Sequence, residues 1–299
     1  PDPTLAARVC APPYDVLSSD EARALAADNP YSFLHVGKPE IDLAPDTDVY
    51  APEVYRKGAE NFGLLREQGA LRQEERPAFY LYRQIMGGHE QVGLVAVVDC
   101  SEYEENIIRK HELTRPAKED DRTRHIEALD AQTGPVFLAY PATEILDSMV
   151  AVHVAQNPEV DFTADDGVRH SAWPIYGEQE IMRVMEIFRE MPCLYIADGH
   201  HRSAAAARVA RARDGAGSSS SFLAVLFPHN QMQILAYNRV VKDLAGMCPA
   251  DFLQRLEDIF EINNGDLPKA KNELGLYLEG KWRLIRFRAE LADVDDLVE

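Results

Sequence analysis

Residues 194–209, LYIADGHHRSAAAARV, gather chemically active side chains around Gly199. They are Asp198, His200, His201, Arg202 and Ser203, between an apolar run and an alanine-rich run. Side chains of these types hold a metal ion, bind a phosphate, supply a general base or cap a helix.

The order of elements in this segment favours phosphate. A strand that ends in Asp-Gly and runs directly into a helix former predicts a tight turn at Gly199. The first amides of a helix lack intrahelical partners and lie at the positive end of its dipole, so they attract anions. His200 and His201 add hydrogen-bond donors, and the guanidinium of Arg202 can donate two hydrogen bonds to one phosphate. The alternative is Asp198 as an N-cap beside two surface histidines.

A metal centre bound by protein ligands fits the segment less well. Adjacent histidines point in different directions on a helix, and no HxxxH or His–carboxylate spacing completes a ligand set. The cysteines lie far apart without a CxxC pair, which is typical of reduced thiols and gives no zinc spacing. They are Cys10, Cys100, Cys193 and Cys248. We expect no metal ligands and a cytoplasmic protein.

Residues 110–125, KHELTRPAKEDDRTRH, form a second charged cluster. His111 and Glu112 do not make the HExxH zinc-protease motif, because its second histidine is missing. Arg115 follows three residues after Glu112 and provides a cation for an anionic ligand.

A helix expected from about residue 119 to 129 places Asp121, Arg122 and His125 on one face, since they are three or four residues apart. A histidine oriented by a carboxylate is a plausible general acid or base. The alternative is a solvated helix with salt bridges on its surface.

Shorter motifs are further candidates for lining a cleft, although each alone is more typical of a turn or a strand end. They are Tyr14 and Asp15 in PPYD, Gln132, Thr133 and Gly134 in AQTGP, and Asn238 and Arg239 in YNRVV.

The charge and hydropathy of the 299 residues limit the partners. A formal net charge of −19 disfavours a general nucleic-acid binder, because phosphate backbones require clustered positive charge. No apolar run approaches a membrane span, and no signal-peptide pattern begins the chain. We expect a small-molecule ligand and neither a nucleic acid nor a membrane. The oligomeric state stays open.

Hairpins mixed with helices predict an α+β fold with a mixed sheet. Hairpins are expected within residues 78–100, 222–241 and 274–287, and single strands at 136–140, 168–176 and 193–197. Helices are expected before residue 29, within 49–71, and at about 119–129, 144–156, 178–191 and 200–213.

Several stretches together resemble the bacterial domain-of-unknown-function 1015 (DUF 1015) family. They are APPYDVLS, NPYSFLHV, RKHELTRPAKEDDRTRHIEALDAQTGPVFLAY, LYIADGHHRSAAAARV and LAVLFPHNQMQILAYNRVV. The resemblance runs over nearly the whole chain, and members usually continue beyond the point where this chain stops.

A more remote resemblance concerns Gly199, His201 and Arg202, which match the Gly-x-His-Arg pattern of the ParB/sulfiredoxin-like superfamily. In that superfamily the strand-turn-helix box binds nucleotide phosphates. Sulfiredoxins carry a cysteine directly after the glycine, where this chain has His200, so their thiol chemistry is not expected. ParB-type proteins bind DNA through further domains, for which no basic stripe or helix-turn-helix is visible. The archaeal ADP-dependent free-serine kinases have a box similar to this one.

These resemblances imply three segments. Residues 1–105 would form an N-terminal α/β lobe with a hairpin, and residues 106–245 a ParB/sulfiredoxin-like phosphate-binding core. Residues 246–299 would begin a C-terminal α/β segment that continues beyond this chain.

The expected function is a nucleotide-dependent kinase of free serine or a similar hydroxyl amino acid, with Mg²⁺ arriving on ADP or ATP. Residues 198–203 would hold the phosphates. Glu112 and His111, or Asp121 with His125, would take the hydroxyl proton. The remaining candidates would bind substrate: Arg115, Arg122, Gln132, Thr133, Asn238 and Arg239.

Three other functions stay open. The same pocket would also suit a phosphatase of phosphoserine-like esters. A nucleotide-sensing module would bind without turnover, as ParB-type relatives suggest. A scaffold without a ligand would require the charged clusters to be dispersed over the surface.

Overall fold

The computed structural model describes residues 1–235 and 238–292 of the chain. It divides into two compact units, Pro1–Gln233 and Ile234–Glu299. Each unit has its own sheet, and each is described by itself below.

The first unit is built on a mixed eight-stranded sheet in the order β3-β7-β4-β8-β2-β1-β6-β5. The β3–β7 and β4–β8 pairs are parallel and the other pairs antiparallel. Its strands are β1 (Phe79–Met86), β2 (His89–Asp99), β3 (Ile108–Arg109), β4 (Val136–Tyr140), β5 (Val160–Thr163), β6 (Arg169–Ile175), β7 (Leu194–Asp198) and β8 (Ser221–Pro228). The expected mixed α+β class is confirmed. Strands on both sides of residue 105 share this sheet.

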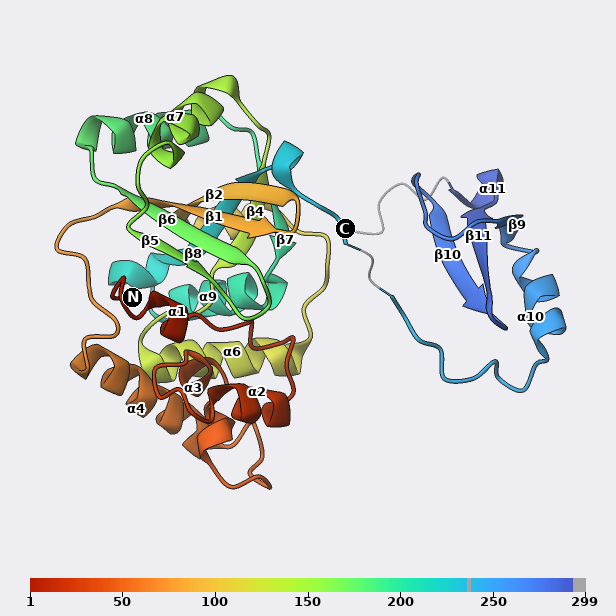
Figure 1. Ribbon diagram of the computed structural model, residues 1–299, viewed down its shortest axis with the longest axis horizontal. Helices are drawn as coiled ribbons and strands as arrows, with labels where there is room; N and C mark the ends of the chain where they lie inside the picture. The colour runs from red at the N-terminus through yellow and green to blue at the C-terminus, as the bar shows by residue number, and fades with distance from the viewer. Residues whose placement is uncertain (236–237, 293–299) are drawn as a thin grey trace. The chain divides into compact units, whose positions relative to one another are not determined.

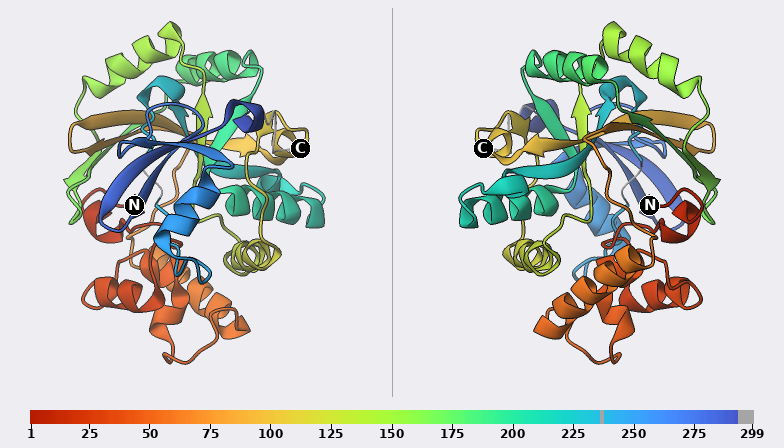
Figure 2. Two further views of the ribbon diagram at one scale, coloured as in Figure 1. Left: turned by 90° about the vertical axis from the view of Figure 1, so that its right-hand side faces the viewer. Right: turned by 90° about the vertical axis from the view of Figure 1, so that its left-hand side faces the viewer.

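Helices cover both faces of this sheet, as Figures 1 and 2 show. On one face lie α7 (Glu144–Val154) and α8 (Glu178–Arg189). On the other lie α6 (Pro116–Leu129) and α9 (His200–Ala212), with the N-terminal helices beyond them. The shorter and N-terminal elements are α1 (Ala6–Val9), α2 (Ser19–Ala26), α3 (Leu34–Gly37), η1 (Pro39–Asp42), α4 (Pro52–Glu67), α5 (Cys100–Glu104), η2 (Gly217–Ser220) and η3 (His229–Gln231).

Local sequence explains where several of these elements begin. Ser18 and Glu21 form a capping box at α2, because each side chain accepts the other's backbone N–H. Pro116 starts α6 at the first helical position, where no N–H is needed. Gly87 and Gly88 turn β1 into β2, as the hairpin prediction requires.

The core has two parts that the site depends on. The larger packs apolar residues of the sheet against α7, α8 and α9, and Leu138, Ile196 and Phe222 are almost completely buried. A smaller cluster joins α4 to α6 through Leu65 and Leu129. This apolar packing holds α6 beside the N-terminal helices. The loops between those helices therefore lie next to the charged side of α6.

The second expected hairpin, within residues 222–241, is not formed by the described residues of this range, and residues 236–237 lie outside them. β8 already pairs with β2 on one edge and β4 on the other, so it has no free edge for a following strand. After η3, residues 232–235 and 238–241 form neither helix nor strand and include exposed apolar side chains, with Ile234 and Val240 each 96% exposed.

The second unit contains a three-stranded antiparallel sheet in the order β10-β11-β9. Its elements are α10 (Pro249–Leu256), β9 (Phe260–Asn264), β10 (Glu273–Leu278), β11 (Lys281–Phe287) and α11 (Ala289–Ala292). The hairpin expected within residues 274–287 is therefore confirmed. Among all described residues, no helix combines the length and apolar character needed to cross a membrane.

Candidate functional site

The turn between β7 and α9 has the strand-glycine-helix geometry that the sequence indicates. Gly199 is the N-cap of α9 with φ +102°, a conformation that favours glycine. No side chain caps the helix, so the Asp198 carboxylate is not an N-cap. The first amides of α9 therefore have no side-chain acceptor from this turn.

Arg202 is packed between two glycines. A Cβ at Gly134 would lie 3.2 Å from its Cδ, and a Cβ at Gly199 would lie 3.2 Å from its Cζ. The guanidinium donates to the Pro135 carbonyl and to the Asp198 carboxylate. Arg202 thus joins the start of β4 to the end of β7, and its role as a phosphate ligand stays a prediction.

The two histidines of the turn accept hydrogen bonds from one loop. The His111 N–H donates to His200 Nε2 at 3.3 Å, and the Arg115 N–H donates to His201 Nε2 at 3.0 Å. The His111 ring also meets the His200 ring edge-on, with centroids 4.4 Å apart. The sequence motifs around residues 111 and 200 are therefore brought together.

Glu112 lies close to this pair of histidines. Its Oε2 lies 3.9 Å from His200 Nδ1, and its side chain is 56% exposed. Burial lowers the pKa of both His200 and His201 below the usual 6.5, and for His200 the nearby His111 adds to this effect.

Ser203 faces the interior. Its side chain is fully buried, and its hydroxyl donates to the carbonyls of Gly199 and His200. The alanines that follow are also buried against the core. Ser203 stabilises the first turn of α9 through these bonds, and its expected contact with phosphate stays a prediction.

A cavity of about 270 Å³ opens between the N-terminal segments and α6. Its walls carry tyrosines, carboxylates and cations from segments that are far apart in the chain. The lining residues are Tyr14, Asp15, Leu17, Ser18, Ser19, Gly37, Lys38, Pro39, Glu40, Val49, Tyr50, Val54, Tyr55, Lys118, Asp121, Arg122 and His125.

Arg122 forms one wall of this cavity. Its guanidinium carbon lies 4.0 Å from the centre of the Tyr14 ring, in a cation–π contact. The guanidinium also pairs with the Asp121 carboxylate at 2.6 Å, and the other Asp121 oxygen accepts the Tyr55 hydroxyl at 2.9 Å. Burial and the Asp121 charge raise the pKa of Tyr55. These contacts hold Arg122 in place at the cavity wall.

His125 does not pair with Asp121, although the helical spacing predicts a shared face. Its Nε2–H donates to the Val36 carbonyl at 2.8 Å, and the side chain is 2% exposed. Burial, followed by the charge of Arg122, lowers its pKa to about 4. His125 is therefore a neutral group that ties α6 to α3.

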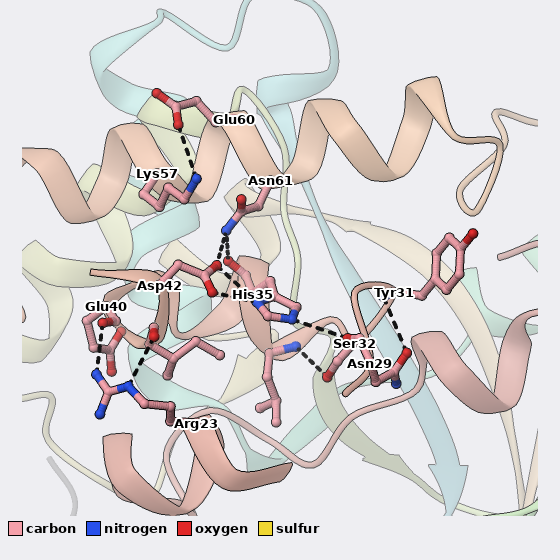
Figure 3. A network of polar contacts seen from close by, with 12 residues as sticks. Arg23, Asn29, Tyr31, Ser32, His35, Glu40, Asp42, Lys57, Glu60 and Asn61 are labelled. Atoms are coloured by element: carbon pink, nitrogen blue, oxygen red, sulfur yellow. Dashed lines mark hydrogen bonds and ion pairs between the residues drawn. The ribbon is translucent and has the colours of Figure 1, made fainter. Parts of the chain in front are cut away.

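The wall formed by residues 37–40 is held by a polar network, shown in Figure 3. His35 Nδ1 lies 2.9 Å from the Asp42 carboxylate, and Asn61 donates to both the Asp42 carboxylate and the His35 carbonyl at 2.7 Å. On the cavity side, Lys38 pairs with Glu40 at 3.0 Å. The network fixes the loop that presents Lys38 and Glu40.

The cavity and the turn at Gly199 act on one another electrostatically. The charge of Arg202 lowers the pKa of Tyr14, although burial raises it more. Lys118 and Asp15, both in the cavity wall, act on the pKa of His201 in opposite directions. The turn, α6 and the Pro-rich N-terminal loop therefore lie close enough for their charges to interact.

Four further candidates are not among the residues that line the cavity. Gln132 bridges to β8, because its amide accepts the Leu223 N–H and donates to the Ser221 carbonyl, each at 2.8 Å. Thr133 is half-buried beside Gly134. Asn238 and Arg239 belong to the second unit. Their expected role in substrate binding stays a prediction.

Residues that the sequence analysis did not assign also enter the site. Tyr55, Lys38, Glu40 and Lys118 line the cavity, and Pro135 holds Arg202. Lys118 had a local signal, since it lies in the charged segment of residues 110–125, and Pro135 ends the AQTGP motif. Tyr55 comes from a helix, and Lys38 and Glu40 from a 3₁₀ turn and the residue before it, without a distinctive motif.

Comparison with models of protein families identifies the family of this chain. The model described as "Protein of unknown function (DUF1015)" matches residues 1–298. The chain belongs to the DUF1015 family. No curated protein and no solved structure matches it. Within this DUF1015 chain, the matched range includes the turn at Gly199 and all residues that line the cavity.

Proposed function

We propose that this DUF1015 protein is a phosphotransferase that moves a phosphoryl group from ADP or ATP to a small hydroxyl-bearing metabolite. Free serine or a similar hydroxyl amino acid is the specific acceptor. The observation that carries the proposal is the cavity of about 270 Å³, with cations and carboxylates in its wall, beside the turn at Gly199.

The charges of the cavity suit a small zwitterion. Arg122, held by Tyr14 and Asp121, and the exposed Lys118 offer cations for a carboxylate. Asp15 offers a carboxylate for an ammonium group. A site that presents both signs in fixed positions favours an amino acid over an apolar ligand.

The turn would receive the phosphates of the donor. The first amides of α9, which no side chain caps, and the donors beside them favour an anion there, and the resemblance to the ParB/sulfiredoxin-like box supports a nucleotide. Mg²⁺ would arrive with the nucleotide and neutralise part of its charge.

Transfer forms a bond between the acceptor oxygen and the terminal phosphorus and breaks the bond to the leaving nucleotide oxygen. The hydroxyl proton needs an acceptor, and the exposed Glu112 suits this role better than the alternative pair. Asp121 is engaged by Arg122 and Tyr55, and His125 is buried against Val36.

The test is incubation of the full chain with serine, Mg²⁺ and either ADP or ATP, followed by mass spectrometry for phosphoserine. We expect phosphoserine in many turnovers, and its loss in Glu112→Gln. Absence of both turnover and nucleotide binding by calorimetry would contradict the proposal. Release of phosphate from phosphoserine without a nucleotide would instead favour a phosphatase, and binding without turnover would favour a sensor.

A further inference from the structure

The loop of residues 111–115 connects β3 to α6 and is held at both ends by the turn at Gly199. The amide at its start donates to His200 and the amide at its end to His201, in both cases to Nε2. A ring nitrogen that accepts a backbone N–H carries no proton, so each ring is neutral with its hydrogen on Nδ1. We call residues 111–115 the latch loop.

Few other contacts hold the middle of the latch loop, residues 113 and 114. Leu113 is 85% exposed, which is unusual for a large apolar side chain. Thr114 donates to Glu119 at 2.8 Å and fixes the entry to α6. The two histidine bonds therefore join the loop directly to the first turn of α9.

We propose that the latch loop is a pH-controlled element beside the turn at Gly199, closed onto His200 and His201 while they are neutral and released when they take up protons. The use of this closed state rests on the proposed function, in which Glu112 of the loop and the turn belong to one site. The opening itself follows from hydrogen-bond chemistry and does not depend on the ligand.

The reason is a change of donor and acceptor. A protonated imidazole carries N–H on both nitrogens, so Nε2 can no longer accept the amide of the loop. Two N–H groups would then face one another at about the distance of a hydrogen bond, at each end of the loop. The loop must move away from the turn to relieve this contact.

Several charged groups set the pH at which this happens. Around His200 are Glu112, Asp198, His111 and His201, of which the carboxylates favour the protonated ring and the histidines the neutral one. Around His201 are Glu112 and Asp15, which favour protonation, and Lys118 and Arg115, which oppose it. Burial outweighs the carboxylates, and the pKa of both rings lies below 6.5. The latch loop is thus closed at neutral pH.

Hydrogen exchange of the full chain without ligand tests the latch directly. Exchange rates of the peptide that spans residues 110–116 are measured from pH 7.5 down to pH 4.5, each corrected for the intrinsic rate. We expect protection of this peptide to fall at least about fivefold within this range, as the loss of one hydrogen bond implies. Equal protection across the range would overturn the proposal.

Variants separate protonation from unfolding. Glutamine places a neutral oxygen near the Nε2 position, so His200→Gln with His201→Gln should keep the loop protected over the same pH range. Alanine at both positions should expose it at every pH. A fall in protection that persists unchanged in the glutamine variant would overturn the proposal.

Two further variants sharpen the result. Glu112→Gln removes a charge that favours the imidazolium, so opening should shift to lower pH. His229 also accepts a loop amide, that of Ala142, at 3.0 Å, so His229→Asn is a matched control. This control should leave residues 110–116 unchanged. Calorimetry with Mg²⁺ and ADP tests the proposed function separately, so a failure of one does not imply a failure of the other.

Discussion

Arg122 lies over the ring of Tyr14, with its guanidinium carbon 4.0 Å from the ring centre. This contact joins α6 to the Pro-rich loop before α2, two segments that are far apart in the sequence. The same guanidinium pairs with Asp121 at 2.6 Å. One side chain therefore connects the loop, the helix and the cavity wall.

Arg122→Gln should weaken both folding and substrate binding. It leaves the largely buried Asp121 carboxylate without its cation, which costs about 1–3 kcal/mol in the free energy of unfolding. We also expect KM for serine to rise about tenfold or more, as loss of a hydrogen bond to a charged group implies. Denaturant unfolding and steady-state kinetics measure the two effects.

Arg124→Gln is the control for this variant, because it changes the same charge on the exposed side of the same helix. It should alter the free energy of unfolding by no more than about 0.5 kcal/mol. Equal effects of the two substitutions would show that Arg122 acts only through net charge.

Gly199→Ala should destabilise the protein by about 1–3 kcal/mol. An alanine would be strained at φ +102°, and its Cβ would lie 3.3 Å from the Val136 Cα and 3.2 Å from the Arg202 Cζ. Gly63→Ala is the matched control, since it lies in α4 with open space around the added Cβ. That change should stabilise by about 0.5–1 kcal/mol. Thermal unfolding of both variants checks the opposite signs.

Tyr55→Phe should cost about 1–2 kcal/mol of stability, because it removes the hydroxyl that donates to Asp121 at 2.9 Å in a buried position. Tyr50→Phe changes an exposed tyrosine of the same cavity and should be nearly neutral. Denaturant midpoints at pH 7.5 compare the two, and a loss in Tyr50→Phe as large as in Tyr55→Phe would contradict the assignment.

The free energy of unfolding should fall as the pH is lowered through the histidine range. Burial lowers the folded-state pKa of His200, His201 and His170 below 6.5, and that of His125 to about 4. The unfolded chain therefore binds more protons, and stability is lost as the pH falls below 6.5. His35 acts in the opposite direction, because Asp42 raises its pKa.

His125 makes the largest contribution to this slope. Its shift from 6.5 to about 4 corresponds to roughly 3 kcal/mol when fully developed. Denaturant titrations between pH 7.5 and 5 measure the slope in the parent protein and in His125→Gln, which retains a donor for the Val36 carbonyl. The slope should decrease in the variant, and an unchanged slope would exclude His125 as its source.

The sequence by itself determined the elements with strong local signals. The Gly87–Gly88 hairpin, the capped α2, the amphipathic α4 and the strand-glycine-helix turn at residue 199 were all predictable, because hydrophobic period, capping and glycine act over a few residues. The strands β3 and β5 were not predicted, since two and four residues carry no clear period. Their pairing with β7 and β6 is what makes them strands.

Only the tertiary structure decided how the charged side chains are used. The spacing in α6 predicts Asp121 and His125 as a pair, yet packing buries His125 against Val36 and leaves Asp121 to Arg122 and Tyr55. Likewise, the described residues of 222–241 do not form the expected hairpin, because the neighbours of β8 come from distant parts of the chain. A residue's partners depend on long-range burial, which local sequence does not encode. For the same reason, only the folded chain shows that His200 and His201 accept the amides of His111 and Arg115.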